Sequence, residues 1–214
     1  MQLLSRDRSR QKGAVVIEFA LCSLVWMPLL LGAIVFGINL VRAIQVSSLS
    51  RDTGHMYAYG VDLSQQSSII PNLGAGVGIT ATGGNGAILL SAITVVTPAD
   101  CAALPAVSCD NLDHPVWTKM LVFGNMADVR TTLGTPDFSG VQADKEMTFP
   151  PAQYVSNTKL LVSDSLLSLF AKDDNNTGHY APGQYAYVSE VNLISQAISW
   201  TDFSGTGSYA RTIF

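Results

Sequence analysis

The chain has 214 residues, of which 48% are hydrophobic and only 13% are charged, with a net charge of −4 and a sequence pI near 5.2. This length and apolar content are enough to bury a core and exclude a disordered chain, and the acidic balance argues against a nucleic-acid partner. Residues 1–13 hold four basic residues and one acidic residue, whereas the rest of the chain holds eight basic and fifteen acidic residues. The chain is therefore a short basic head followed by a long acidic body.

The first predicted element is a membrane span, because the 23 residues between Glu18 and Arg42 carry no charge. As an α-helix rising about 1.5 Å per residue, they would extend over roughly 34 Å, which is enough to cross the hydrocarbon core of a bilayer. The basic head before the span predicts that the N-terminus stays in the cytoplasm and that the acidic body is exported. No A-x-A site of a secretory signal peptide follows the span, so we expect the span to be retained.

Three residues inside the span suggest how the helix packs. Pro28 lacks a backbone donor, which predicts a kink in the helix. Ala33 and Gly37 lie four residues apart on one face, which would let a second helix approach closely. Small residues are also common in membrane helices that make no such contact.

Glu18 is the sharpest single signal in the sequence. A carboxylate that sits at membrane depth is costly, and such residues are usually functional and paired. If the chain is cut after Gly13, Ala14 gains an α-ammonium group four residues before Glu18 on the same helix face. The same cut would remove the whole basic head.

These residues also carry a family resemblance. Residues 13–20 (GAVVIEFA), followed by about twenty apolar residues, resemble the site that prepilin peptidases cut in type IV pilin-like proteins. With residues 28–32 (PLLLG) and 36–37 (FG), they resemble the TadE/TadG-like minor pilins, or pseudopilins, of the tight-adherence (Flp) pilus system. Residues 119–125 and 184–191 are similar to a middle and a late strand of that family.

The resemblance implies a role for each residue of the motif. Gly13 would precede the cut, Ala14 would begin the mature chain, and Glu18 would neutralise the terminal amine of a neighbouring subunit. It further implies a structural, single-pass protein of the bacterial inner membrane, without enzymatic activity. Its partners would be membrane lipid, a prepilin peptidase, other pilins or pseudopilins, and the Tad secretion machinery.

The exported body is predicted to begin with a continuation of the membrane helix and to end in a sheet domain. The expected organisation is a leader at 1–13, a transmembrane helix at 14–41, a helix extension at 42–62, a Gly-rich loop at 63–86 and an α+β domain at 87–214. Within the extension, we expect the helix to end at about Tyr59. A long N-terminal helix followed by a mainly antiparallel sheet packed on its extension is a pilin-like α+β fold.

Three strands are predicted in the exported domain from their β-branched, apolar or alternating patterns. They lie at 87–96, 116–123 and 185–199. Residues 159–170 have apolar side chains near helical spacing and predict either a short helix or a strand with a turn.

Cys101 and Cys109 flank seven residues between the first two predicted strands. In an oxidising compartment this spacing predicts a disulfide, which would stabilise the domain by about 2–3 kcal/mol in the chain-entropy model. A metal site would need His114 as a third ligand, and the irregular spacing of the three residues does not favour it. Cys22 lies in the membrane helix, too far away to pair with either.

No motif in the sequence indicates catalysis. His55, His114 and His179 are far apart, and neither G-x-S-x-G nor H-E-x-x-H occurs. Residues 173–178 (DDNNTG) offer oxygen ligands without the spacing of a calcium loop, so we expect a solvated turn and no cofactor. Two alternatives to a pilin stay open: an uncleaved, membrane-anchored periplasmic binding or sensor domain, and an anchored hydrolase with a polar cleft.

Overall fold

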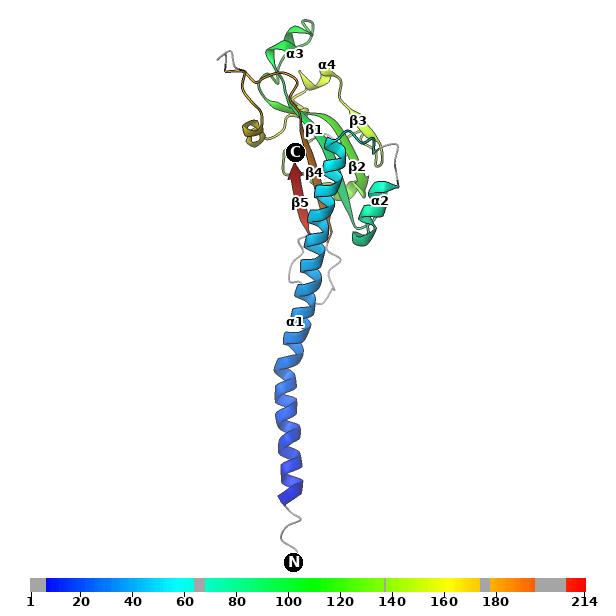
Figure 1. Ribbon diagram of the computed structural model, residues 1–214, viewed down its shortest axis with the longest axis vertical. Helices are drawn as coiled ribbons and strands as arrows, with labels where there is room; N and C mark the ends of the chain where they lie inside the picture. The colour runs from blue at the N-terminus through cyan, green and yellow to red at the C-terminus, as the bar shows by residue number, and fades with distance from the viewer. Residues whose placement is uncertain (1–6, 64–67, 137, 174–177, 195–206) are drawn as a thin grey trace, which may run out of the picture. The chain divides into compact units, whose positions relative to one another are not determined.

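The computed structural model describes residues 7–63, 68–136, 138–173, 178–194 and 207–214 (Figure 1). The chain begins with one helix, α1, which runs for 52 residues over Asp7–Ala58. The contacts within the chain as a whole divide it into two compact units, Met1–Arg42 and Ala43–Phe214. The described part of the first unit is entirely helical, and α1 is long and apolar enough to cross a membrane.

The second unit is built around a five-stranded antiparallel sheet, so the fold is α+β with the helix first and the sheet after it. The strand order is β3-β2-β1-β4-β5, and β1 lies at the centre (Figure 1). Every residue of β1 is buried, which explains why this strand is mostly apolar, with Ser91 and Thr94 as its polar side chains. The strands are β1 (Gly86–Val95), β2 (Pro115–Gly124), β3 (Glu146–Thr148), β4 (Ala186–Leu193) and β5 (Tyr209–Ile213).

The last turns of α1 pack on one face of this sheet, through β1 and β4. Val46, Leu49 and Tyr57 are buried on one side of the helix, in a cluster that includes Leu90 of β1 and Val191 of β4. Their spacings of three, eight and eleven residues place the side chains on a single helix face. The sheet therefore orders the part of α1 that belongs to the second unit.

Two buried hydroxyl groups on the same helix face bond to β4. Ser50 Oγ donates to the carbonyl oxygen of Ser189 at 3.0 Å, and Thr53 Oγ1 lies 2.9 Å from Ser189 Oγ. Thr53 also donates to the carbonyl of Leu49 within the helix at 2.7 Å. Next to them, a Cβ added at Gly54 would lie 2.3 Å from the ring of Phe214. The helix thus approaches the sheet closely, with its buried polar groups paired.

A glycine cap ends α1 one turn beyond the buried face. Gly60 has a φ of +73°, and its N–H donates to the carbonyl of Tyr57 at 3.0 Å. The Val61 N–H donates to the carbonyl of Met56 at 3.1 Å, which completes a Schellman motif. Because a left-handed residue cannot continue the helix, the chain leaves the helix axis at this point, and Leu63 still packs in the same sheet-facing cluster.

The opposite face of the sheet is covered by irregular segments. Trp117, Met120 and Val188 lie in its core together with Leu133 and Leu166 from the covering loops. The short helical elements of the second unit are α2 (Ile69–Gly74), η1 (Ala75–Val77), α3 (Pro98–Ala102), η2 (Met126–Asp128), α4 (Pro151–Tyr154), η3 (Thr158–Leu160) and η4 (Asp164–Leu169).

The buried carboxylate of Glu190 links strand β5, at the edge of the sheet, to the irregular segments that cover this face. Glu190 of β4 is 1% exposed, and its Oε1 accepts bonds from the Tyr209 hydroxyl and from the Thr132 N–H at 3.2 Å. Arg211 of β5 donates to the Thr132 hydroxyl at 2.9 Å. Burial, and then the bond to Glu190, raise the pKa of Tyr209 to about 12.

The sequence located the long elements of this unit more accurately than the short ones. The strands predicted at 87–96 and 116–123 are β1 and β2, and the described start of the one predicted at 185–199 is β4. Residues 159–170 form the 3₁₀ turns of η3 and η4, and the expected Gly-rich loop contains α2 and η1. The strands β3 and β5 were not predicted.

Candidate functional site

The residues singled out for processing lie in the first turns of α1. Gly13 and Ala14 are in helical conformation, and Glu18 lies one turn further on. The side chain of Glu18 is exposed, and no hydrogen bond or ion pair joins it to a residue from Val15 onward whose side chain the structure describes. Most of the large apolar side chains between Val15 and Ile44 are also exposed, among them Phe19 at 74% and Leu24 at 75%. This segment therefore displays apolar surface that the described chain does not cover.

The three residues expected to shape helix packing also lie in this exposed stretch. The helix continues without interruption through Pro28, and a bend of its axis there stays a prediction. Ala33 is exposed, and a Cβ added at Gly37 meets no heavy atom within 4 Å. Within the described chain, nothing therefore occupies the space beside Gly37.

The disulfide expected between the first two strands is present. Cys101, in α3, is bonded to Cys109, and the two Cα atoms are 5.7 Å apart. The helix that carries Cys101 is itself fixed at its start, where Thr97 and Asp100 form a capping box. Cys22 is free and exposed. The bond closes the connection between β1 and β2 into a small loop.

The described residues contain no cluster of three or more His, Cys, Asp or Glu side chains that could hold a metal ion. The acidic run at 173–178 falls mostly outside the described residues, so its expected role as a solvated turn stays a prediction. Where the chain is described, the titratable side chains meet mainly in pairs.

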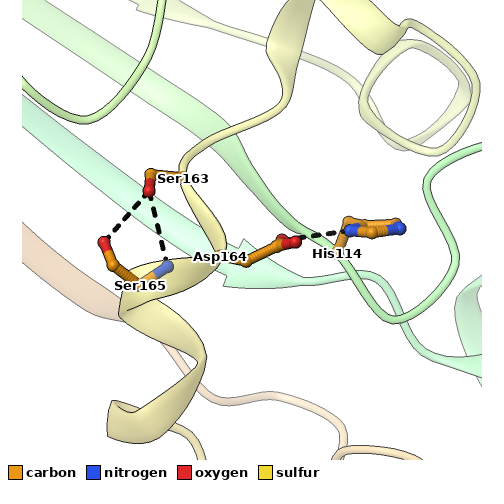
Figure 2. A network of polar contacts seen from close by, with 4 residues as sticks. All are labelled: His114, Ser163, Asp164 and Ser165. Atoms are coloured by element: carbon orange, nitrogen blue, oxygen red, sulfur yellow. Dashed lines mark hydrogen bonds and ion pairs between the residues drawn. The ribbon is translucent and has the colours of Figure 1, made fainter.

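One such pair lies beside two serines, an arrangement that invites comparison with a hydrolase triad (Figure 2). His114 Nδ1 lies 3.1 Å from Asp164 Oδ1, and both side chains are substantially exposed. Ser163 Oγ lies 3.1 Å from Ser165 Oγ and accepts a bond from the Ser165 N–H at 3.4 Å. Neither serine bonds to the histidine, as Figure 2 shows, so the hydroxyls have no base in place to activate them. Ser163 acts here as the N-cap of η4.

A second pair has the same character. His179 Nδ1 lies 2.8 Å from Asp113 Oδ2, and Asp113 adopts a left-handed φ of +61°. The bond links the turn before β2 to the segment before β4. His55 instead packs against the ring of Phe214, with the ring centroids 4.3 Å apart and the ring planes tilted by 52°. That the protein is not an enzyme stays a prediction from its sequence.

A pocket of about 660 Å³ opens in the second unit where α1 ends. We call it the tyrosine pocket; its lining includes Tyr57, Tyr154, Tyr185, Tyr187, Lys119 and Glu146. Sequence reasoning did not find it. One signal for it was present in the sequence. Tyr185 and Tyr187 are two residues apart, so in a strand both rings point to the same face. The other lining residues are brought together only by strand register and by the end of α1.

The chain was compared with protein-family models, with curated proteins and with solved structures, and none of the three comparisons returns a match. The arguments about function therefore rest on the residues and their geometry.

Proposed function

We propose that this chain is a structural minor pilin or pseudopilin of a Tad (Flp) pilus, stored in the bacterial inner membrane and cut after Gly13 by a prepilin peptidase. The observation that carries the proposal is the placement of Glu18. It lies in α1 at the edge of 23 uncharged residues, and no ion pair joins it to any residue from Val15 onward whose side chain the structure describes. The resemblance of residues 13–20 to a prepilin cleavage site supports the same reading.

The proposed mechanism is a transfer of the apolar helix from lipid to a bundle of helices. Residues 1–13 keep the N-terminus in the cytoplasm by the positive-inside rule, and α1 anchors the chain while the second unit is exported. A buried carboxylate is costly unless it is paired. Cleavage creates an ammonium group on Ala14, and the amine of a neighbouring subunit pairs with Glu18 when the helices assemble. The helix is thereby stable in the filament only beside a processed neighbour.

Cleavage is tested by mass spectrometry of the chain produced together with a prepilin peptidase. We expect a mature chain that begins at Ala14. Gly13→Val should retain the leader, because a branched side chain then occupies the position before the cut. Gly32→Val, a matched change later in α1 where an added Cβ meets nothing within 4 Å, should still be cut. An intact leader on the unmodified chain in the presence of active peptidase contradicts the proposal.

The role of Glu18 is tested in cells that need this protein to form pili. Glu18→Gln keeps the shape of the side chain and removes its charge, so we expect normal cleavage and loss of assembly. Asp52→Asn makes the same chemical change at an exposed position of α1 and should leave assembly unchanged. Normal levels of pili in cells that carry Glu18→Gln would contradict the charge-pairing mechanism.

A second candidate function is favoured by the tyrosine pocket. An uncleaved, membrane-anchored binding or sensor protein would need a ligand site in its exported domain, and the pocket offers one. The two functions differ in the fate of residues 1–13. A leader that stays on the chain in its native membrane selects the anchored binding protein.

A further inference from the structure

The tyrosine pocket exists because the sheet extends further than the helix that covers it. The Schellman motif at Gly60 ends α1 beside Tyr57, and the following turn, Gly60 to Asp62, forms one wall of the pocket. Beyond that wall no helix covers this part of the sheet face in the described chain, and α4 contributes Tyr154 on another side. The hollow is therefore a consequence of where the helix stops.

The floor of the pocket is one row of residues across four strands. Thr148 of β3 pairs with Lys119 of β2, Lys119 pairs with Ala92 of β1, and Ala92 pairs with Tyr187 of β4. Paired residues in an antiparallel sheet project to the same face. Ala92 has the smallest side chain of the row, so the floor is lowest at the centre, between Lys119 and Tyr187. The volume of about 660 Å³ is in the range of small-molecule sites.

Aromatic rings form much of the lining. The rings of Tyr57 and Tyr187 meet edge to face with centroids 5.7 Å apart, and Tyr185 and Tyr187 lie 28° from parallel with centroids 6.5 Å apart. Tyr185 is 52% exposed, although it is a large aromatic residue next to a strand. These contacts hold the rings in place and leave ring faces open to a ligand.

Polar groups of three kinds line the same space. Lys119 Nζ lies 2.9 Å from Glu146 Oε1, and this bond raises the pKa of the Lys119 ammonium group, so the group is charged at neutral pH. An ammonium group only donates hydrogen bonds, a carboxylate only accepts them, and a tyrosine hydroxyl does both. The Tyr57 side chain is 6% exposed, and its hydroxyl has no hydrogen-bond partner among the described residues. Seven buried side-chain polar atoms have no hydrogen-bond partner among the described residues, and the Tyr57 hydroxyl is the one that belongs to a residue of the pocket lining.

The charged side chains of the lining are of both signs: Lys119 carries an ammonium group, and Glu146 and Asp62 carry carboxylates. A quaternary ammonium ion suits aromatic rings and is attracted by carboxylates, but it has no hydrogen-bonding group and would leave Lys119 and the Tyr57 hydroxyl without a partner. An anion could accept from Lys119 but would be repelled by the two carboxylates. A purely apolar ligand would bury the Lys119–Glu146 pair without hydrogen bonds from a ligand, which is costly. A neutral ring with an apolar face and a rim of hydroxyls satisfies all of these groups.

We propose that the tyrosine pocket binds a neutral saccharide, which stacks on Tyr185 and Tyr187 and bonds through its hydroxyls to Lys119, Glu146 and the Tyr57 hydroxyl. The rings contact the apolar C–H face of the sugar, and the Lys119–Glu146 pair provides a donor and an acceptor side by side. The site lies in the second unit and does not depend on the cut after Gly13. It can therefore exist in a pilin or in an uncleaved anchored protein.

The test is titration of the full chain, in a detergent without a sugar headgroup, with cellotriose, maltotriose and N,N′,N″-triacetylchitotriose. Binding is followed by saturation-transfer difference NMR and by tyrosine fluorescence. We expect at least one of the three to bind at a single site. Tyr185→Ala should weaken that binding at least tenfold, whereas Tyr185→Phe should keep it within about threefold because the ring remains. Tyr59→Ala, a change at an 83% exposed tyrosine outside the pocket, should have no effect.

Several outcomes overturn the proposal. One is that none of the three saccharides binds to a chain whose near-UV circular dichroism is intact. Another is that Tyr185→Ala binds the saccharides with unchanged affinity. Binding of tetramethylammonium at this site in preference to the saccharides would assign the pocket to a cation instead. The charged pair gives an independent check that does not alter the rings. Lys119→Met should weaken saccharide binding at least fivefold while the domain still unfolds cooperatively, and unchanged affinity there counts against the proposed hydrogen bonds.

Discussion

Both parts of α1 contain large apolar side chains but place them differently. From Val15 to Ile44 most of the large apolar residues are exposed, on every side of the helix. From Val46 to Tyr57 the apolar residues are confined to one face and buried against the sheet, and polar residues occupy the rest. The first pattern suits lipid or other helices, which contact a helix all round, whereas the second suits a soluble domain. The pattern of side chains along one uninterrupted helix thus makes its first part suitable for apolar surroundings and its second part suitable for packing on a sheet.

The largest expected effect compares the same truncation in the two parts. Leu49→Ala removes a side chain that is 5% exposed in the sheet-facing cluster, and should lower the free energy of unfolding by about 2–4 kcal/mol. Leu29→Ala removes a 61% exposed side chain, and should leave that free energy within about 0.5 kcal/mol. Urea denaturation of the second unit in detergent-solubilised chain measures both. Equal losses of unfolding free energy in the two variants would contradict the distinction between an exposed and a buried part of α1.

A smaller effect compares two glycines of the same helix. Gly54→Val would place a side chain against the ring of Phe214 and within 3.0 Å of the Ser189 Cβ, so we expect a loss of about 1–3 kcal/mol. Gly37→Val adds a side chain where nothing lies within 4 Å and should not change unfolding of the second unit. The same denaturation assay reports both. A stability for Gly54→Val equal to that of the unmodified chain would show that β4 and Phe214 move aside freely.

The smallest expected effect concerns alkaline pH. Burial raises the pKa of Tyr57 in the folded chain, and the Glu146 carboxylate adds to this, whereas a tyrosine of the unfolded chain titrates near about 10. Because the folded chain then keeps protons that the unfolded chain releases, stability is complete below about pH 10 and falls as the pH rises above it. Tyr57→Phe should make this fall less steep, with little change at pH 7. Tyr59→Phe is the exposed control and should reproduce the unmodified profile.

How far the sequence predicted the fold depended on what each element buries. β1 was found because a central strand is buried on both faces and is therefore mostly apolar. The helix was expected to end at about Tyr59 within an extension bounded at residue 62, and α1 ends at Ala58; the stop signal itself, Gly60 in a left-handed conformation, was not recognised from the sequence. β3 has three residues, Glu146, Met147 and Thr148, and is too short and too polar to give a periodic signal. β5 reads YARTI, in which Arg211 interrupts the apolar residues.

The candidate sites divide in the same way. Gly13, Ala14 and Glu18 could be proposed from sequence because their spacing is local and their setting is a long apolar run. The Cys101–Cys109 disulfide was predicted because only seven residues lie between the two cysteines. The tyrosine pocket brings Tyr57, Lys119 and Tyr187 together from positions up to 130 residues apart in the sequence. Such a site depends on both the register of the sheet and the length of α1, and no single segment of the sequence determines either.

The C-terminal strand provides the last packing contacts of the second unit. The backbone of Phe214 exchanges two hydrogen bonds with Tyr187, and its ring lies over His55 and Gly54 of α1. If the chain crosses a membrane in the order of its synthesis, as the proposed function requires, α1 emerges before residues 209–214 and lacks these contacts until they follow. Under that proposal the sheet-facing side of α1 would be incompletely covered during export, and a chaperone or an early partner could bind it in that interval.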